Sequence, residues 1–362
     1  MNQVSDKQND DRSVEFDRAR LHQFLDDTFG ASPKFELSRI SGGQSNPTFF
    51  LTHGDQRLVL RKKPPGNLLP GAHAVEREFR VLSALSEKTE VPVPRPVLLH
   101  EDTDLLGTPF YLMERVEGRV FSDCALPDVS ASERRELYFG MAEAMAKLHA
   151  VRPDEIGLGD YGRPGNYFQR QIARWTKQWN ESPSERIAAL DELAQWLPDH
   201  LPNDDGATSI AHGDFRLGNM LFHPTEPKVV AILDWELSTL GHPLADLGFC
   251  CMPWHTAPTE YGGILGLPLA AQSLPTERQF IDAYYRNAIP TSRLERFHVA
   301  FALFRFAVIF VGIADRVRLG NAAAHDASSV GPLAERFAQR GLEVATGRQS
   351  FAEIGVNTAP GS

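Results

Sequence analysis

Hydrophobic and polar residues alternate along several short segments in the first third of the chain. Because successive side chains of a strand point to opposite faces of its sheet, this alternation predicts strands. We expect strands at residues 35–40, 48–52, 57–62, 97–100 and 110–115. His53-Gly54-Asp55-Gln56 is a hairpin signal between the second and the third strand. The pattern therefore predicts a small antiparallel sheet.

A helical period of hydrophobic residues interrupts this sheet once and dominates the rest of the chain. Residues 74–86 place Val75 and Leu82, among others, on one helical face. Ser130 and Glu133 have the spacing of a capping box at the start of the next helix. Further helices are expected at Tyr167–Asn180, 187–201, 276–287, 292–319 and 330–346, with short strands around a loop within 210–235.

The chain has 362 residues, which is long for one compact core and suits two lobes. We interpret Glu117-Gly118 as a hinge. The expected fold class is α+β, with a small N-terminal antiparallel sheet that carries one helix and a larger, mostly helical C-terminal lobe. The expected segments are a disordered polar leader at 1–14, an N-terminal lobe at 15–117, a C-terminal lobe at 118–346 and a flexible tail at 347–362.

Composition narrows the class of partner and the compartment. A formal net charge of −10 argues against binding to nucleic acid, which requires clustered Lys and Arg. The three cysteines have no metal-binding spacing and are too few to crosslink a chain of this length, so we expect a reducing compartment and a cytoplasmic protein. The polar leader lacks the apolar core of a signal peptide. Composition leaves the oligomeric state open.

The apolar segment near residues 292–319 resembles a membrane span in composition. Arg305 interrupts it, and the longest uncharged apolar run, Phe306 to Ala314, has nine residues. A bilayer requires about twenty. We therefore expect a buried helix of the C-terminal lobe and no insertion into a membrane.

The most informative motif is His212-Gly213-Asp214-Phe215-Arg216-Leu217-Gly218-Asn219, followed later by Asp234 at the end of an apolar run. The spacing Asp-x-x-x-x-Asn is that of the protein-kinase catalytic loop. Phosphoryl transfer uses an Asp that accepts the proton of the attacking hydroxyl, and an Asn and a second Asp that hold Mg²⁺. Each fragment alone also fits a loop with turn-capping side chains. Together, in this order, they predict Asp214 as the base and Asn219 and Asp234 as metal ligands.

Two further residues of this region are interpreted as structural. We expect His212 to be a neutral imidazole that fixes the loop and takes no part as a base. Asp246 is a candidate buried carboxylate that supports the catalytic loop through hydrogen bonds. The competing interpretation, an Asp at a helix N-terminus, is almost the same structural claim.

A glycine turn lies between the first two predicted strands and is formed by Ser41, Gly42, Gly43, Gln44, Ser45 and Asn46. Glycines allow close approach of the backbone to phosphates, and the N–H groups of such a turn attract anions. Hairpin turns without ligands also contain Gly-Gly. The second strand after this turn ends in a cation, which favours the phosphate-covering interpretation.

That cation is Arg61, which we expect to bind phosphate oxygens, since Arg can do so through two parallel hydrogen bonds. Strand alternation turns Lys62 to the opposite face. The expected partner of Arg61 is a Glu of the helix at 74–86, where Glu76 and Glu78 are both available and Glu78 is favoured. Solvated surface charges are the alternative.

Two nucleotide-binding patterns do not apply. Gly157, Gly159 and Gly162 match the dinucleotide fingerprint, but they do not join a strand to a helix. The pattern G-x-x-x-x-G-K-[ST] of the P-loop is absent from the sequence.

These motifs together resemble the aminoglycoside phosphotransferase-like kinases, a family that also includes choline and homoserine kinases. The likeness runs from about residue 35 to 320. The stretches Leu60–Gly66, Tyr167–Trp175 and Phe304–Ala307 are similar to one branch, the kinase-like domain fused to acyl-CoA dehydrogenases of the 10 and 11 types in animals. Stand-alone bacterial forms are sometimes labelled acyl-CoA dehydrogenases. No flavin-binding pattern is found in this sequence.

The resemblance implies a two-lobed protein-kinase-like fold, with nucleotide bound by the N-terminal lobe and both catalysis and substrate binding in the C-terminal lobe. It implies ATP and Mg²⁺ as cofactors, with the glycine turn, Arg61 and Glu78 anchoring the phosphates and adenine against Glu114 to Val116. Arg61 departs from the usual Lys, which leaves the strength of its phosphate contact open.

For this branch the implied substrate is a small hydroxylated molecule, with 4-hydroxyacyl-CoA as the leading choice. Arg170, Arg174 and Arg305 are candidate contacts for an anionic CoA, and structural ion pairs are the alternative for all three. Two other functions remain open. One is an aminoglycoside, choline or homoserine type of kinase, and the other is a nucleotide-binding pseudokinase with a regulatory role.

Overall fold

A computed structural model describes residues 16–40, 46–66, 73–288, 292–318 and 327–348, the side chains of 327–331 excepted. The leader at 1–14, residues 41–45 of the glycine turn and the tail from 349 onward lie outside the described residues. The chain forms two compact units. The first comprises Met1–Arg119, Asp154–Leu158 and Asn219–Ser238, and the second Val120–Pro153, Gly159–Gly218 and Thr239–Ser362.

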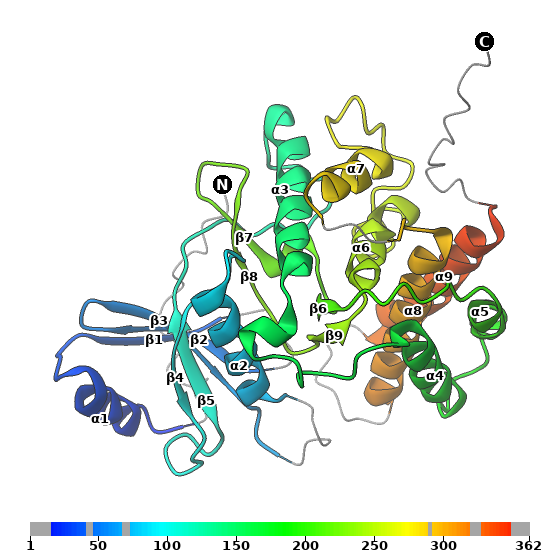
Figure 1. Cartoon of the computed structure of the whole chain (residues 1–362). Helices are drawn as coiled ribbons and strands as arrows, with labels where there is room; N and C mark the ends of the chain where they lie inside the picture. Colours follow the sequence, from blue (N-terminus) through cyan, green and yellow to red (C-terminus); the bar gives the residue numbers. More distant parts are fainter. Residues whose placement is uncertain (1–15, 41–45, 67–72, 289–291, 319–326, 349–362) are drawn as a thin grey trace. The chain divides into compact units, whose positions relative to one another are not determined.

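The first unit is built on a five-stranded antiparallel sheet with the order β1-β2-β3-β5-β4 (Figure 1). Its strands are β1 (Phe35–Arg39), β2 (Thr48–His53), β3 (Gln56–Lys62), β4 (Pro96–His100) and β5 (Phe110–Glu114). All five predicted strands are confirmed, with ends that differ by one residue. The register pairs Arg61 of β3 with Tyr111 of β5. This places both side chains in the centre of the sheet.

Two helices accompany the sheet. The predicted helix is α2 (Val75–Lys88), which contacts β4 and β5 through its buried face. A second helix, α1 (Arg18–Phe29), was not predicted. Asp17 caps it by accepting a hydrogen bond from the amide of Ala19, and Leu21 and Leu25 enter the core formed by the sheet. Phe24 and Phe29 of the same helix are partly buried against this core.

Residues 219–238 belong to the first unit although they follow the helices of the second in sequence. They contain the hairpin of β7 (Met220–Phe222) and β8 (Val229–Ile232). The amide of Ile232 donates to the carbonyl of Pro92, and an isolated bridge joins Arg119 to Phe222. These contacts hold the hairpin to the segments that flank the last two strands of the sheet.

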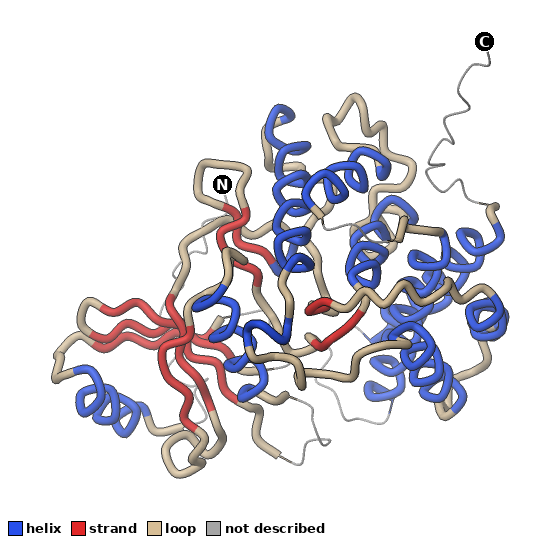
Figure 2. The backbone as a smooth tube through the Cα atoms, viewed as in Figure 1, coloured by secondary structure: helices blue, strands red, loops and turns tan. Residues whose placement is uncertain are grey.

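Helices predominate in the second unit, where the described strands are the short antiparallel pair β6 (Ser209–Ala211) and β9 (Thr239–Gly241) (Figure 2). Helix α8 (Arg296–Arg318) contacts four other helices, α4, α5, α6 and α9. The remaining helices are α3 (Ala131–Ala150), α4 (Tyr167–Asn180), α5 (Ala188–Asp199), α6 (Pro243–Cys251), α7 (Glu277–Asn287) and α9 (Ala327–Thr346). The structure thus confirms the α+β class with an antiparallel N-terminal sheet and a helical C-terminal region.

The apolar helix α8 is long and apolar enough to cross a membrane, yet 67% of its most hydrophobic window is buried within the protein. Its burial accords with the expectation of a core helix. The adjacent cysteines Cys250 and Cys251 are also buried, and burial raises the pKa of both thiols.

One predicted local motif was wrong. Ser130 precedes α3, but its side chain makes no capping bond, and its hydroxyl contacts Ser132 instead. The capping box lies at α7, where the hydroxyl of Thr276 accepts from the amide of Gln279 and the Gln279 side chain accepts from the amide of Thr276. Because several polar groups compete for the same amides, spacing alone did not decide between them.

Candidate active site

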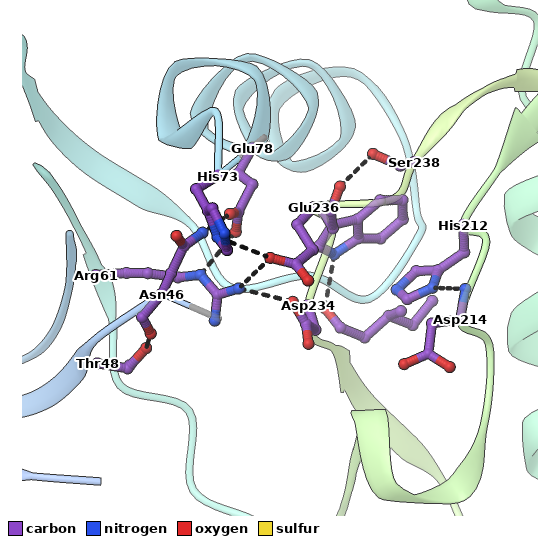
Figure 3. Close-up of polar contacts among 12 residues, drawn as sticks. Asn46, Thr48, Arg61, His73, Glu78, His212, Asp214, Asp234, Glu236 and Ser238 are labelled. Carbon is purple, nitrogen blue, oxygen red and sulfur yellow. Dashed lines mark hydrogen bonds and ion pairs between the residues drawn. The ribbon is translucent and has the colours of Figure 1, made fainter. Parts of the chain in front are cut away.

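Arg61 is the centre of a charged cluster in the first unit (Figure 3). Strand β3 places its guanidinium against the carboxylate of Glu78 on α2, with 2.9 Å between Nε and Oε2. The predicted partner is therefore present. The contact is electrostatic, because the Nε–H bond does not point along it. Glu78 also accepts hydrogen bonds from Asn46 Nδ2 at 2.7 Å and from the Tyr111 hydroxyl at 3.1 Å.

The other side of the guanidinium faces two carboxylates of the segment after β8. Arg61 Nη2 donates to Asp234 Oδ1 at 2.7 Å and lies 3.9 Å from Glu236 Oε2. Burial raises the pKa of Glu78 to about 7, against the opposing attraction of Arg61. With three carboxylates around one guanidinium, ionisation of all three leaves an excess of negative charge. Such a site favours an additional cation.

The β7–β8 hairpin brings the backbone of Asn219 next to the residue that precedes Asp234, so the two expected metal ligands are near each other in the fold. The amide of Leu233 donates to the carbonyl of Asn219 at 2.8 Å, so Asn219 lies opposite the residue that precedes Asp234. Asp234 has a φ of 65°, an unusual value for a residue other than glycine. A strained backbone at a carboxylate is often found at functional sites. The amide oxygen and carboxylates here are donors that suit Mg²⁺.

The loop that carries the expected base, residues 212–218, lies in the second unit, where Asp246 of α6 holds its backbone. The carboxylate accepts from the amide of His212 at 2.7 Å and from the amide of Gly213 at 2.9 Å. His149 of α3 lies 3.3 Å from the same carboxylate. Burial alone would raise the pKa of Asp246, but the hydrogen bonds from His149 and the Gly213 amide hold it below the ordinary value.

His212 is fully buried and works within the loop. Its Nδ1 accepts a hydrogen bond from the amide of Asp214 at 3.2 Å (Figure 3). An accepting Nδ1 is unprotonated, so the ring is the neutral tautomer with its hydrogen on Nε2. This geometry is that of a group that shapes the loop.

The carboxylate of Asp214 is partly exposed and pairs with a cation that the sequence analysis did not single out. Arg216 Nε lies 3.2 Å from Asp214 Oδ2, and both residues belong to the same loop. The signal for it was only a separation of two residues from the expected base.

The three arginines considered for CoA binding are in different surroundings. Arg170 donates to the backbone carbonyls of Arg163 and Pro164, at the start of α4. Arg174 lies over the Trp175 ring, 5.2 Å from its centroid. Arg305 donates to the carbonyl of Gly213 at 2.7 Å. The described contacts of all three are to carbonyls and a ring, not to carboxylates.

Two other sets of expected nucleotide contacts are the glycine turn, of which the structure describes only Asn46, and the segment from Glu114 to Val116, which it describes in full. Ser41, Gly42, Gly43, Gln44 and Ser45 lie outside the described residues, whereas Asn46 is buried against Glu78. Glu114 donates its amide to the Arg95 carbonyl and pairs with the Arg95 side chain. An adenine contact at Glu114 therefore cannot use that amide in this arrangement. Val116 follows β5 and is half-buried.

Sequence reasoning also missed Glu236, Tyr111 and His149. Glu236 could have been found from its position two residues after Asp234. Tyr111 and His149 gave no such signal, because their roles depend on which strand or helix lies opposite. Both contact a carboxylate only after the elements have packed.

Among the described residues, one other group has the composition of a metal site. His22, Asp26 and His53 bring their ligand atoms within 4.8 Å of one another. Their hydrogen bonds are complete without a cation, since His53 Nε2 lies 2.9 Å from Asp26 and His22 Nε2 lies 2.8 Å from the Ser32 carbonyl. This group links α1 to β2 and is separate from the Arg61 cluster.

Comparison with known proteins decides the family. The model of the family described as "Phosphotransferase enzyme family" matches residues 36–288, which is more than half of the chain. The chain belongs to this phosphotransferase family. The resemblance inferred from its motifs is therefore confirmed.

Curated relatives of this phosphotransferase have names that refer to a different activity. The chain is 39% identical over 342 residues to acyl-CoA dehydrogenase family member 10 of Mus musculus. The match covers 92% of this chain and 32% of the relative. The chain is also 39% identical to family member 11 of Homo sapiens, covering 95% of this chain and 44% of the relative. The chain thus spans less than half the length of these relatives.

Solved structures agree with the family and the fold. A crystal structure from Ralstonia eutropha JMP134, provisionally named an aminoglycoside phosphotransferase, is 45% identical with a TM-score of 0.81, covering 92% of this chain and 99% of that one. A hygromycin B complex of aminoglycoside phosphotransferase APH(4)-Ia with AMP-PNP has a TM-score of 0.61 at 15% identity, covering 90% and 99%. That second likeness shows the fold alone, which is protein-kinase-like.

Proposed function

We propose that this chain transfers the γ-phosphoryl group of ATP to a hydroxyl group of a small molecule, in a reaction that depends on Mg²⁺. One observation carries the proposal. The β7–β8 hairpin brings Asn219 beside the residue preceding Asp234, and Asp234 is within 2.7 Å of Arg61. A metal-bound triphosphate requires an amide, a carboxylate and a cationic group. Here the cationic group is a guanidinium that buried residues hold in place.

Asn219 and Asp234 would hold the metal through their side-chain oxygens. When bound, Mg²⁺ neutralises charge on the phosphate oxygens. The excess of carboxylates around Arg61 makes a divalent cation electrostatically favourable there. Glu236 adds negative charge to the same place without being required as a ligand.

Arg61 would bind phosphate oxygens, with Glu78, Asn46 and Tyr111 holding the guanidinium in position. In the described structure, Nη2 of Arg61 donates a hydrogen bond to Asp234. Nucleotide binding would therefore exchange part of this ion pair for contacts with phosphate. The glycine turn at residues 41–46 would cover the phosphates, and the segment from Glu114 to Val116 would contact adenine.

Asp214 would accept the proton from the acceptor hydroxyl. As the oxygen–phosphorus bond to the acceptor forms, the bond between the γ-phosphorus and its bridging oxygen breaks, and ADP leaves. His212 and Asp246 would not react but would keep the loop in shape. The neutral His212 tautomer supports this division of roles.

The acceptor we propose is a hydroxylated fatty acyl thioester, with 4-hydroxyacyl-CoA as the leading choice. Support comes from the names of the relatives, which refer to acyl-CoA metabolism. Arg170 and Arg174 would lie near the anionic CoA. The chain spans only part of these relatives, so the assignment rests on the phosphotransferase portion that the two share.

Substitution of Asp214 tests the proposal directly. Asp214→Asn should lower kcat about 10²–10⁴-fold, because general-base catalysis commonly contributes that much. Binding of Mg²⁺ and ATP, measured by calorimetry, should survive in this variant and be lost in Asp234→Ala. Equal turnover of wild type and Asp214→Asn on 4-hydroxydecanoyl-CoA would rule out the assigned base. Binding of Mg²⁺ and ATP without turnover on any alcohol would instead indicate a regulatory pseudokinase.

A further inference from the structure

The peptide that joins Gly213 to Asp214 is held at both of its polar ends. Its N–H is donated to Nδ1 of His212 at 3.2 Å, and its carbonyl accepts from Nη2 of Arg305 at 2.7 Å. The Gly213 amide is separately bound by Asp246. The orientation of this peptide plane sets the direction in which the Asp214 side chain leaves the backbone.

Gly213 would otherwise allow this peptide to rotate. It has a φ of 84°, in the region that favours glycine, and it lacks the Cβ that restricts the backbone of other residues. His212 belongs to the same loop and moves with it, so its bond does not fix the peptide to the rest of the unit. Arg305 does, because it comes from a different element.

Arg305 is well placed to act as a fixed anchor. It lies in the interior of α8, a helix that packs against α4 and α6 in the second unit. Its guanidinium lies 5.7 Å from the centroid of the Trp175 ring of α4, a distance suited to a cation–π contact. An arginine so restrained loses little freedom when it donates to a carbonyl.

We propose that Arg305 is a positioning residue that keeps the Gly213–Asp214 peptide, and with it the Asp214 carboxylate, in the orientation required for proton abstraction. This gives Arg305 a different task from the CoA contact considered from the sequence. The proposal rests on the proposed phosphotransferase function in its kinetic part only. Its structural part concerns the loop and requires no substrate.

Kinetics separate positioning from substrate binding. We expect Arg305→Ala to lower kcat on 4-hydroxydecanoyl-CoA about 10–100-fold, since small misplacement of a catalytic group can cost 10²-fold. The KM values for ATP and for the thioester should stay within about twofold. Arg305→Lys, which keeps a charged donor but not the guanidinium, should recover part of kcat. A rise in the KM for the thioester with an unchanged kcat would overturn the proposal in favour of a CoA contact.

Arg186→Ala is the matched control, because Arg186 lies over the Trp179 ring of the same helix α4 and its described contacts are with residues 179–191, away from the loop. Its kcat should match wild type. Amide hydrogen exchange of residues 209–219 supplies a second measurement without substrate. Exchange should increase at least fivefold in Arg305→Ala and remain unchanged in Arg186→Ala. Unchanged exchange in folded Arg305→Ala would overturn the proposal.

Failure of the proposed function can be distinguished from failure of the positioning role of Arg305. If wild type turns over none of the alcohols tested, the proposed function is wrong, whatever the exchange data show. If Asp214→Asn is inactive and Arg305→Ala is fully active, only the positioning role is wrong. Should Arg305→Ala fail to fold in thermal melts, Arg305→Lys and Arg305→Gln replace it in both measurements, and wild-type kcat and exchange in both would reject the role.

Discussion

Arg61 shows how much one residue depends on partners that are distant in sequence. Its guanidinium contacts Glu78, seventeen positions later, and Asp234, which follows the hairpin of β7 and β8. The carboxylate of Glu78 is buried and would be costly to ionise without these neighbours. Asn46 and Tyr111 satisfy the remaining lone pairs. The cluster is therefore a single electrostatic unit, and a change in any member alters the others.

His298 of α8 gives a test of pH dependence at the residue scale. It is buried beside His242 and Phe168, and burial lowers its pKa to about 3. Because the folded pKa lies below the unfolded value, only the unfolded chain takes up the proton between about pH 6.5 and 3. The stability contributed by the neutral ring is therefore present above pH 6.5 and is lost as the pH falls.

From pH 6.5 to 5 this loss amounts to roughly 2 kcal/mol for one group. Chemical unfolding of wild type and His298→Gln at several pH values measures it. The wild-type midpoint should fall more steeply below pH 6.5 than that of the variant. Parallel pH dependences of the two proteins would contradict the shifted pKa of His298.

At the scale of elements, the sequence analysis missed α1 and α6 for different reasons. All nine residues of α6 (Pro243–Cys251) are buried, so no polar face marks the helix. Helix α1 does have an apolar stripe, formed by Leu21, Phe24, Leu25 and Phe29, but the sequence analysis did not single it out. Amphipathic elements such as α4 were predicted with the observed ends, because one of their faces is buried and the other is exposed.

The packing of α6 against α8 predicts a sharp effect of one methyl group. A Cβ at Gly248 would lie 2.7 Å from the carbonyl oxygen of His298, which is backbone and cannot move aside. Gly248→Ala should therefore lower the free energy of unfolding by about 1–3 kcal/mol. The midpoint of thermal or chemical unfolding measures the change.

Gly312 is the matched control on α8. A Cβ there would lie 3.2 Å from Nε2 of Gln178, the end of a flexible side chain. Gly312→Ala should be neutral or stabilising by up to about 1 kcal/mol, because alanine favours the helix over glycine. A larger loss at Gly312 than at Gly248 would show that backbone contact is not what limits the α6–α8 packing.

At the scale of the whole molecule, the acceptor that we propose is suggested by the names of the relatives. The chain matches less than half of proteins named for acyl-CoA dehydrogenation, yet the matched portion belongs to a phosphotransferase family. A phosphorylated hydroxyacyl-CoA would connect the two chemistries. The hygromycin B phosphotransferase shares the fold at 15% identity, which carries no information on the acceptor.

A panel of acceptors tests this choice. With Mg²⁺ and ATP, we expect kcat/KM on 4-hydroxydecanoyl-CoA to exceed that on free 4-hydroxydecanoic acid at least tenfold, because the CoA portion supplies additional binding energy. Kanamycin, choline and homoserine should be poorer acceptors still. Coupled release of ADP measures all five. Preferential turnover of kanamycin would place the chain with the antibiotic-modifying kinases instead.

The sequence by itself determined the secondary-structure elements of this protein and the types of its candidate reactive residues. Alternation and helical period depend on local geometry, so the five strands and most helices could be predicted. The Asp-x-x-x-x-Asn spacing is also local, and it indicated the family. Glu78 was favoured over Glu76 as the partner of Arg61, and β3 and α2 do bring Glu78 to it.

Only the tertiary structure decided which groups meet across elements. The additions of Tyr111 to the Arg61 cluster, of His149 to Asp246, and of Arg305 to Gly213 join residues whose separation in sequence carries no signal. Their contacts arise when hydrophobic faces pack and bring buried polar groups together, and each such group must then find a partner. Packing, rather than local pattern, thus sets the surroundings of Arg61 and of Asp246.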